Sequence, residues 1–137
     1  MRFDFRGFPA ATAGAITPRP MADVWLDGLD TGPLACLVDT GALRTRFSRA
    51  LAELAGIDVD TSVSHVVVVG GIEVSAAPAL VSLRMQGADE TLGWEATVWF
   101  CDPWPFPFQL LGLEGFLQHF RVTLSAYHEW LECHPET

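Results

Sequence analysis

The stretch Leu34-Ala35-Cys36-Leu37-Val38-Asp39-Thr40-Gly41-Ala42 decides both the fold and the candidate chemistry of this chain. Five apolar residues predict a buried strand that carries the carboxylate of Asp39 out of the core. Gly41 permits a tight turn, the hydroxyl of Thr40 can hold the loop through hydrogen bonds, and Ala42 leaves space beside the carboxylate. A fixed, uncrowded carboxylate is what a group that activates water requires.

Asp-Thr-Gly is also ordinary turn chemistry, and the chain holds a second copy at Asp30-Thr31-Gly32. That copy follows Asp27-Gly28-Leu29, a run dense in turn formers, so we assign it to a hairpin turn without a catalytic role. Asp39 differs because it follows an apolar strand and precedes another strand. The context therefore favours Asp39 as the candidate catalytic residue.

Composition narrows the classes of protein to which the chain can belong. The chain has 137 residues, 50% hydrophobic and 18% charged, which is enough apolar content for one domain with a core. Its formal charge of −9 argues against binding to nucleic acid. The absence of Lys excludes Schiff-base chemistry and a Ser–Lys dyad, and the absence of Asn excludes a papain-type triad. The histidines and cysteines match no zinc spacing, so we expect neither a metal nor a cofactor.

The sequence predicts a cytoplasmic protein without membrane contact. No apolar stretch reaches the roughly 18 uncharged residues that a membrane span needs. Asp4 and Arg6 interrupt the segment where a secretory signal would run. Cys36, Cys101 and Cys133 are odd in number and far apart, which predicts reduced thiols rather than a disulfide framework.

Period-two patterns dominate the chain and predict a mainly β architecture with two short helices. We expect an N-terminal extended arm over residues 1–20 and one domain over residues 21–137. One helix is expected over 49–55, and helical turns over 113–120. The expected strands are 21–26, 33–38, 43–47, 64–69, 72–85, 92–101, 109–111, 121–124 and 128–133.

Two of these segments have apolar faces that a structure can check. In the strand over 43–47, alternation places Leu43, Thr45 and Phe47 on the buried face. In the helix over 49–55, Leu51 and Leu54 are expected on the inner face.

Two further motifs follow the Asp39 segment along the chain. Val69-Gly70-Gly71-Ile72 predicts a Gly-rich hairpin tip, and Leu110-Leu111-Gly112 predicts a buried strand that passes close to another backbone. Together with Leu37-Val38-Asp39-Thr40-Gly41-Ala42 they resemble the retropepsin-like aspartic proteases. That family has an apolar pair before Asp-Thr/Ser-Gly-Ala/Ser, a Gly-rich flap, and two apolar residues with a Gly before a short helix. The resemblance spans about residues 20–133.

The resemblance implies a fold, a reaction and an assembly. The fold is a mainly β, single-domain, closed β-barrel of the acid-protease type. The reaction is peptide-bond hydrolysis by an aspartic endopeptidase, with water activated between Asp39 and its symmetry mate in a homodimer. The resemblance gives Thr40, Gly41 and Ala42 supporting roles, makes 69–72 a flap over a polypeptide substrate, and makes 110–112 a structural strand beside the site. One chain supplies one qualifying Asp, so the second carboxylate must come from a second copy.

The chain departs from the family pattern near this site. Glu114-Gly115 replaces the more common acidic–aromatic pair, and three prolines alternate with aromatic residues in the loop 102–108. Arg44 and Arg46 lie just behind the active-site turn, where a cation would oppose a shared proton. Alternation predicts that both arginines point away from the core face and are solvated.

Two other functions stay open. The same fold could serve as a catalytically silent dimerisation or peptide-binding module, or as a monomeric barrel that binds an apolar ligand. The aromatic-rich region from Trp94 to Phe108 is predicted as buried core followed by an exposed Pro-rich loop, with a peptide-binding wall as the alternative.

Overall fold

From residue 21 onward most strands follow the predicted period-two segments, whereas three short strands lie within 2–9 and 16–19, where an extended arm was expected. The computed structural model describes residues 1–9 and 16–136. The strands are β1 (Arg2–Asp4), β2 (Arg6–Pro9), β3 (Ile16–Arg19), β4 (Met21–Leu26), β5 (Leu34–Val38), β6 (Arg46–Ser48), β7 (His65–Val69), β8 (Ile72–Gln86), β9 (Thr91–Asp102), β10 (Gln109–Leu111), β11 (Phe120–Ser125) and β12 (Trp130–Pro135). The helices are α1 (Arg49–Ala55) and the single 3₁₀ turn η1 (Thr61–Val63).

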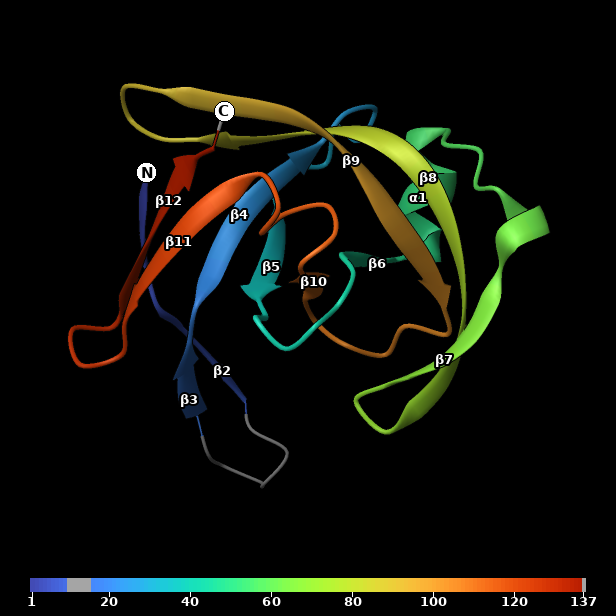
Figure 1. Ribbon diagram of the computed structural model, residues 1–137, viewed down its shortest axis with the longest axis horizontal. Helices are drawn as coiled ribbons and strands as arrows, with labels where there is room; N and C mark the ends of the chain where they lie inside the picture. Colours follow the sequence, from blue (N-terminus) through green and yellow to red (C-terminus); the bar gives the residue numbers. More distant parts are fainter. Residues whose placement is uncertain (10–15, 137) are drawn as a thin grey trace.

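The strand that precedes Asp39 belongs to a sheet that closes on itself. The order is β4-β5-β10-β6-β9-β8, and β4 also pairs with β8, so these six strands form a barrel (Figure 1). β7 is added to β8 as the second arm of a hairpin. The predicted fold class, a mainly β closed barrel with few helices, is confirmed, although only α1 lies where a helix was expected.

The barrel encloses one main apolar core. It is built from the inward side chains of the strands together with residues of the 113–120 segment. The largest fully buried side chains are Phe47, Phe100, Phe116, Met21, Leu26, Met85, Leu111 and Leu131. Burial of each such side chain stabilises the fold by about 1.5–3 kcal/mol, so this core fixes the positions of β5 and β10.

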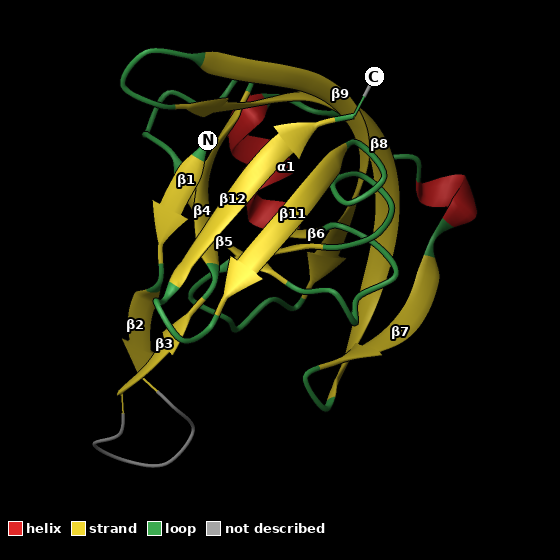
Figure 2. Cartoon of the chain, turned by 60° about the vertical axis from the view of Figure 1, so that its left-hand side comes forward, coloured by secondary structure: helices red, strands yellow, loops and turns green. Residues whose placement is uncertain are grey.

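The N-terminal strand is paired with the C-terminal strand of the same chain. β1 lies antiparallel to β12, with Arg2 opposite Glu132, and β12 continues to β11 in a three-stranded sheet (Figure 2). The Arg2 guanidinium donates to the Glu132 carboxylate at 2.6 Å, and this bond holds the pKa of Glu132 below its usual value. Residues 10–15 of the predicted arm, and residue 137, lie outside the described residues. The boundary between arm and domain stays a prediction.

Two hairpins project from the same end of the barrel. One is formed by β2 and β3 and the other by β7 and β8, and Figure 1 shows them on the side toward which β5 runs. The residues after β5 therefore lie at the same end of the barrel as these two strand pairs.

The predicted helical turns over Leu113–Phe120 are wrong, because the segment forms turns. Gly115 has a φ of +94°, in the left-handed region that a continuous α-helix cannot include. Its N–H binds the side-chain oxygen of Gln118 at 2.7 Å, and its carbonyl accepts from the indole of Trp94 at 2.8 Å. The short helix elsewhere is confirmed as α1, ended by Gly56 at a φ of +70°.

Two predicted core positions are exposed. Leu43 is 74% exposed because strand β6 begins only at Arg46, although Thr45 and Phe47 are fully buried as expected. Leu54 is 69% exposed because Ala52 takes the buried position of α1 and Leu51 packs beside it.

Candidate functional site

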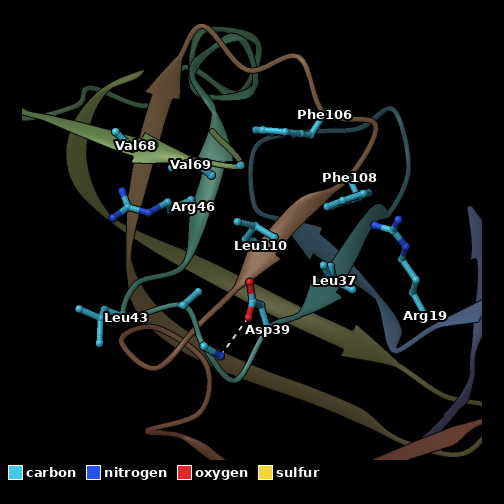
Figure 3. Close-up of a pocket in the computed structure, with 13 residues that line it drawn as sticks. Arg19, Leu37, Asp39, Leu43, Arg46, Val68, Val69, Phe106, Phe108 and Leu110 are labelled. Carbon is cyan, nitrogen blue, oxygen red and sulfur yellow. Dashed lines mark hydrogen bonds between the residues drawn. The ribbon is translucent and has the colours of Figure 1, made fainter. Parts of the chain in front are cut away.

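The carboxylate of Asp39 is held by its own loop. Asp39 follows β5, and its backbone N–H donates to the carbonyl of Leu111 at 2.9 Å. Its Oδ1 accepts from the N–H of Gly41 at 2.9 Å, and its carbonyl accepts from Ala42 at 3.2 Å (Figure 3). A Cβ at position 41 would lie 3.4 Å from that Oδ1, which is an ordinary van der Waals contact. The half-buried carboxylate is thus fixed with Oδ2 left available.

The Leu110-Leu111-Gly112 segment supports the Asp39 loop from beneath. β10 pairs in parallel with β5, with Leu111 opposite Val38. A Cβ at Gly112 would lie 2.5 Å from the carbonyl oxygen of Arg44 and 2.7 Å from that of Ala42. The predicted close approach of this segment to another backbone is confirmed, and it requires glycine at position 112.

Glu114 and Trp99 form a second support that the sequence did not indicate. The indole Nε1 of Trp99 donates to Oε1 of Glu114 at 2.7 Å. The Arg44 guanidinium lies 4.1 Å from the centre of a Trp99 ring, and the His65 ring stacks on Trp99 with centroids 5.5 Å apart. Arg44 is therefore engaged with Trp99 rather than solvated.

The predicted flap is the tip of the β7–β8 hairpin. Gly70 and Gly71 have φ values of +57° and +80°, as a two-residue turn between Val69 and Ile72 requires. Gly70 rests on the ring of Phe106, because a Cβ there would lie 2.8 Å from its Cζ. The hairpin tip is thus in contact with the Pro-rich loop of the same chain.

The aromatic rings of the Pro-rich loop pack against one another in sequence order. Trp104 and Phe106 pack edge to face at 5.0 Å, and Phe106 and Phe108 stack at 6.3 Å. The Trp104 indole donates to the carbonyl of Phe108 at 3.0 Å, which closes the loop. Phe106 and Phe108 line the groove described next, so these two rings are available as the wall of a peptide-binding site.

A groove of about 510 Å³ brings much of the predicted site together (Figure 3). Of the predicted residues, it is lined by Asp39, Gly41, Ala42, Val69, Gly70 and Leu110. The other predicted residues do not line the groove. Thr40 and Gly71 are exposed, and Ile72 packs against a separate apolar cluster. Leu111 and Gly112 lie in and just after β10, which supports the Asp39 loop. The lining residues not predicted are Arg19, Leu37, Leu43, Arg46, Val68, Phe106 and Phe108.

The two cationic side chains of the groove lie at opposite ends in Figure 3, with Asp39 between them. Among the described residues, neither makes an ion pair with Asp39 within 4.0 Å. Arg19 lies over the Phe108 ring at 5.6 Å. The expectation that Arg46 is solvated is wrong, because its Nη1 is buried beneath the β7–β8 hairpin.

The cysteines are buried within the described structure and form no disulfide there. Burial raises the pKa of the Cys36 and Cys101 thiols, and raises that of Cys133 to about 11. The described residues contain no group of three or more potential metal ligands. No helix within the described ranges is long and apolar enough to cross a membrane.

No family model matches the chain, and no curated protein matches it. Among solved structures, the chain is similar to the EIAV protease complexed with the inhibitor HBY-793. The two are 17% identical, the alignment covers 76% of this chain and 88% of that chain, and the TM-score is 0.37.

Proposed function

We propose that the chain is a homodimeric, retropepsin-like aspartic endopeptidase. One observation carries the proposal: a half-buried carboxylate, Asp39, stands between the cations of an apolar groove and is held by the N–H of Gly41 at 2.9 Å. The groove is bounded on another side by the hairpin tip at Val69 and Gly70. An apolar cleft with few fixed polar groups is the usual form of a substrate site.

The reaction needs two carboxylates that share one proton. The ionised carboxylate takes a proton from water, and the resulting hydroxide attacks the peptide carbonyl carbon. The protonated carboxylate gives its proton to the carbonyl oxygen, so a neutral diol forms. The carboxylate that took the proton from water then gives it to the peptide nitrogen, the other carboxylate takes a proton from a diol hydroxyl, and the C–N bond breaks to leave a carboxylic acid and an amine. One chain offers one such Asp, so we assign the second role to Asp39 of a second copy related by a two-fold axis.

The neighbours of Asp39 receive positioning roles in this proposal. Thr40 is exposed beside the carboxylate in the single chain, so it is free to lock the two loops across the dimer axis. Gly41 holds the carboxylate, and Ala42 leaves room for water. The hairpin tip at 69–72 covers the bound peptide and excludes solvent. We place the enzyme in the cytoplasm, which accords with three buried and unpaired cysteines.

The direct test compares Asp39→Asn with Asp30→Asn. Asp30 is exposed in the β4–β5 turn and has the same Asp-Thr-Gly context, which makes it a matched control. We expect the unmodified chain and Asp30→Asn to cleave an unstructured polypeptide at acidic pH, with activity lost as the pH rises and the shared proton leaves. We expect no cleavage by Asp39→Asn. Cleavage that persists in Asp39→Asn, or that is independent of pH, would refute the proposal.

A catalytically silent peptide-binding or dimerisation module is the second candidate. The contact between Gly70 and Phe106 favours it, because a hairpin tip in contact with its own Pro-rich loop opposes the opening needed for turnover. This candidate predicts a dimer by sedimentation and saturable peptide binding without cleavage at any pH. Cleavage abolished by Asp39→Asn would exclude it.

A further inference from the structure

Among the described residues, Arg46 is distinguished by a side-chain nitrogen that is both buried and without a hydrogen-bond partner. Its Nη1 is buried and makes no hydrogen bond within the described structure. By contrast, Arg6 pairs with Asp23 at 2.9 Å and Arg44 stacks on Trp99. Buried polar groups are normally hydrogen-bonded, so an unsatisfied one indicates a missing partner.

The surroundings of Arg46 do not neutralise its charge. No described carboxylate lies within ion-pair distance of its guanidinium. Burial raises the pKa of the neighbouring Cys101 thiol by more than the Arg46 guanidinium lowers it, so the thiol stays neutral. The formal charge of the chain is −9, yet this cation is left without an anion. Leaving a buried donor of a charged group without an acceptor is unfavourable, and an incoming anion would relieve that cost.

The position of Arg46 shows which kind of anion fits. Arg46 lines the same groove as Asp39, at the end formed by Leu43 and Val68 (Figure 3). These two apolar side chains are 74% and 71% exposed, so they can pack against the carbons of a ligand. A guanidinium presents a planar set of donors that matches a carboxylate.

We propose that Arg46 binds a carboxylate of a peptide in the groove and makes the site selective for acidic peptides. The carboxylate belongs to an Asp or Glu side chain near the scissile bond, or to the C-terminus of the peptide. This inference rests on the proposed function in one respect, that the groove accepts a peptide. Arg19, at the other end, faces the Phe108 ring and is not part of the proposal.

Binding to the Asp39→Asn chain separates recognition from catalysis. A displayed library of random twelve-residue peptides is selected at pH 6, where Asp and Glu side chains are ionised. Selected peptides are then synthesised in matched forms with Glu replaced by Gln, and with the C-terminus free or amidated. A charge-assisted hydrogen bond contributes about 1.5–3 kcal/mol, so we expect one of these changes to weaken binding roughly 10- to 100-fold. Loss on Glu→Gln assigns the side chain, and loss on amidation assigns the C-terminus.

The control for this experiment makes the same change in net charge at a site away from the groove. Arg46→Gln and Arg121→Gln each remove one positive charge, but Arg121 is exposed on β11 and does not line the groove. The measured quantity is the ratio of the affinity for the acidic peptide to the affinity for its neutral form. We expect this ratio to fall to about one in Asp39→Asn/Arg46→Gln and to persist in Asp39→Asn/Arg121→Gln. A purely structural role of Arg46 would change the melting temperature and leave the ratio of the two affinities unchanged.

The possible failures are distinct. A preference that survives Arg46→Gln, a library without acidic enrichment, or no selected peptide at all overturns the role of Arg46. Cleavage by the unmodified chain without acidic preference overturns it as well, while the endopeptidase proposal stands. Acid-selective binding that depends on Arg46, without cleavage by the unmodified chain, supports this inference and removes the endopeptidase proposal.

Discussion

The hydroxyl oxygen of Thr45 accepts a hydrogen bond from the backbone N–H of Gly112 at 3.1 Å. The Thr45 side chain is fully buried, and its backbone N–H donates to the carbonyl of Glu114 at 2.9 Å. The segment after Asp39 and the segment after β10 are therefore joined by two bonds from one residue. The position of the Asp39 loop therefore depends on these two hydrogen bonds of Thr45, called the Thr45 joint below.

Replacing Thr45 with Val tests the joint. Valine has nearly the same shape but leaves the buried N–H of Gly112 without its acceptor, which costs about 1–3 kcal/mol. We expect the free energy of unfolding, measured in urea, to fall by this amount. Thr123→Val is the control, because Thr123 is exposed on β11 and its replacement should change stability by less than about 0.5 kcal/mol. Equal effects of the two changes would contradict the role of the joint.

Replacing Gly112 with Ala tests the close approach of the two segments. The new methyl carbon would lie 2.5 Å from a backbone oxygen, and backbone cannot move aside as a flexible side chain can. We expect a loss of about 1–3 kcal/mol or more in unfolding free energy. Gly93→Ala is the matched control, since the nearest atom to its Cβ is at 3.7 Å. If both variants unfold at the same urea concentration, the approach is looser than described.

Replacing Phe106 with Ala tests the contact that holds the hairpin tip. Without the ring beneath Gly70, the turn at 69–72 loses its packing and opens more often. We expect amide hydrogen exchange over these residues to accelerate by roughly tenfold, corresponding to about 1.4 kcal/mol. Tyr127→Ala removes an aromatic ring that is 92% exposed and should leave the exchange unchanged. Unaltered exchange in Phe106→Ala would show that the β7–β8 pairing alone fixes the tip.

Stability should fall in alkaline solution because of the buried thiols. Burial raises the pKa of Cys133 from its ordinary 9.0 to about 11, with the positive N-terminus acting weakly in the opposite direction. Between these values the folded chain keeps a proton that the unfolded chain releases. Its contribution to stability is therefore complete below pH 9 and lost as the pH rises toward 11, at no more than about 1.4 kcal/mol per pH unit. Urea unfolding at pH 8 and pH 10.5 measures the loss, and the loss should be smaller in Cys133→Ala. An identical loss in both proteins would exclude Cys133 as a contributor.

The sequence predicted the strands well because their patterns are local. The run Leu34–Val38 reads as a buried strand without knowledge of its neighbours, and it is β5. The segment Leu113–Phe120 failed for the opposite reason. Its composition suits a helix, but Gly115 takes a positive φ that bonds to Trp94 and Gln118 stabilise.

The sequence indicated the positions of Asp39, Gly41 and Gly112 because local backbone geometry determines them. Arg46 and Phe106 could not be placed, because their roles depend on how distant segments cover them. Alternation placed Arg46 outside the core face, but the outer side of β6 lies under the β7–β8 hairpin. Phe106 became part of the groove only through its contact with a glycine 36 positions earlier in the chain.

The pairing of β1 with β12 has a consequence for biosynthesis. Arg2 and its partner Glu132 are 130 residues apart in sequence. While the ribosome is making the intervening barrel, the first strand has no edge to join, and its exposed backbone is open to foreign strands. Contacts of such long range also slow folding, since a large loop must close before they form. The barrel can therefore form before β1 pairs with β12.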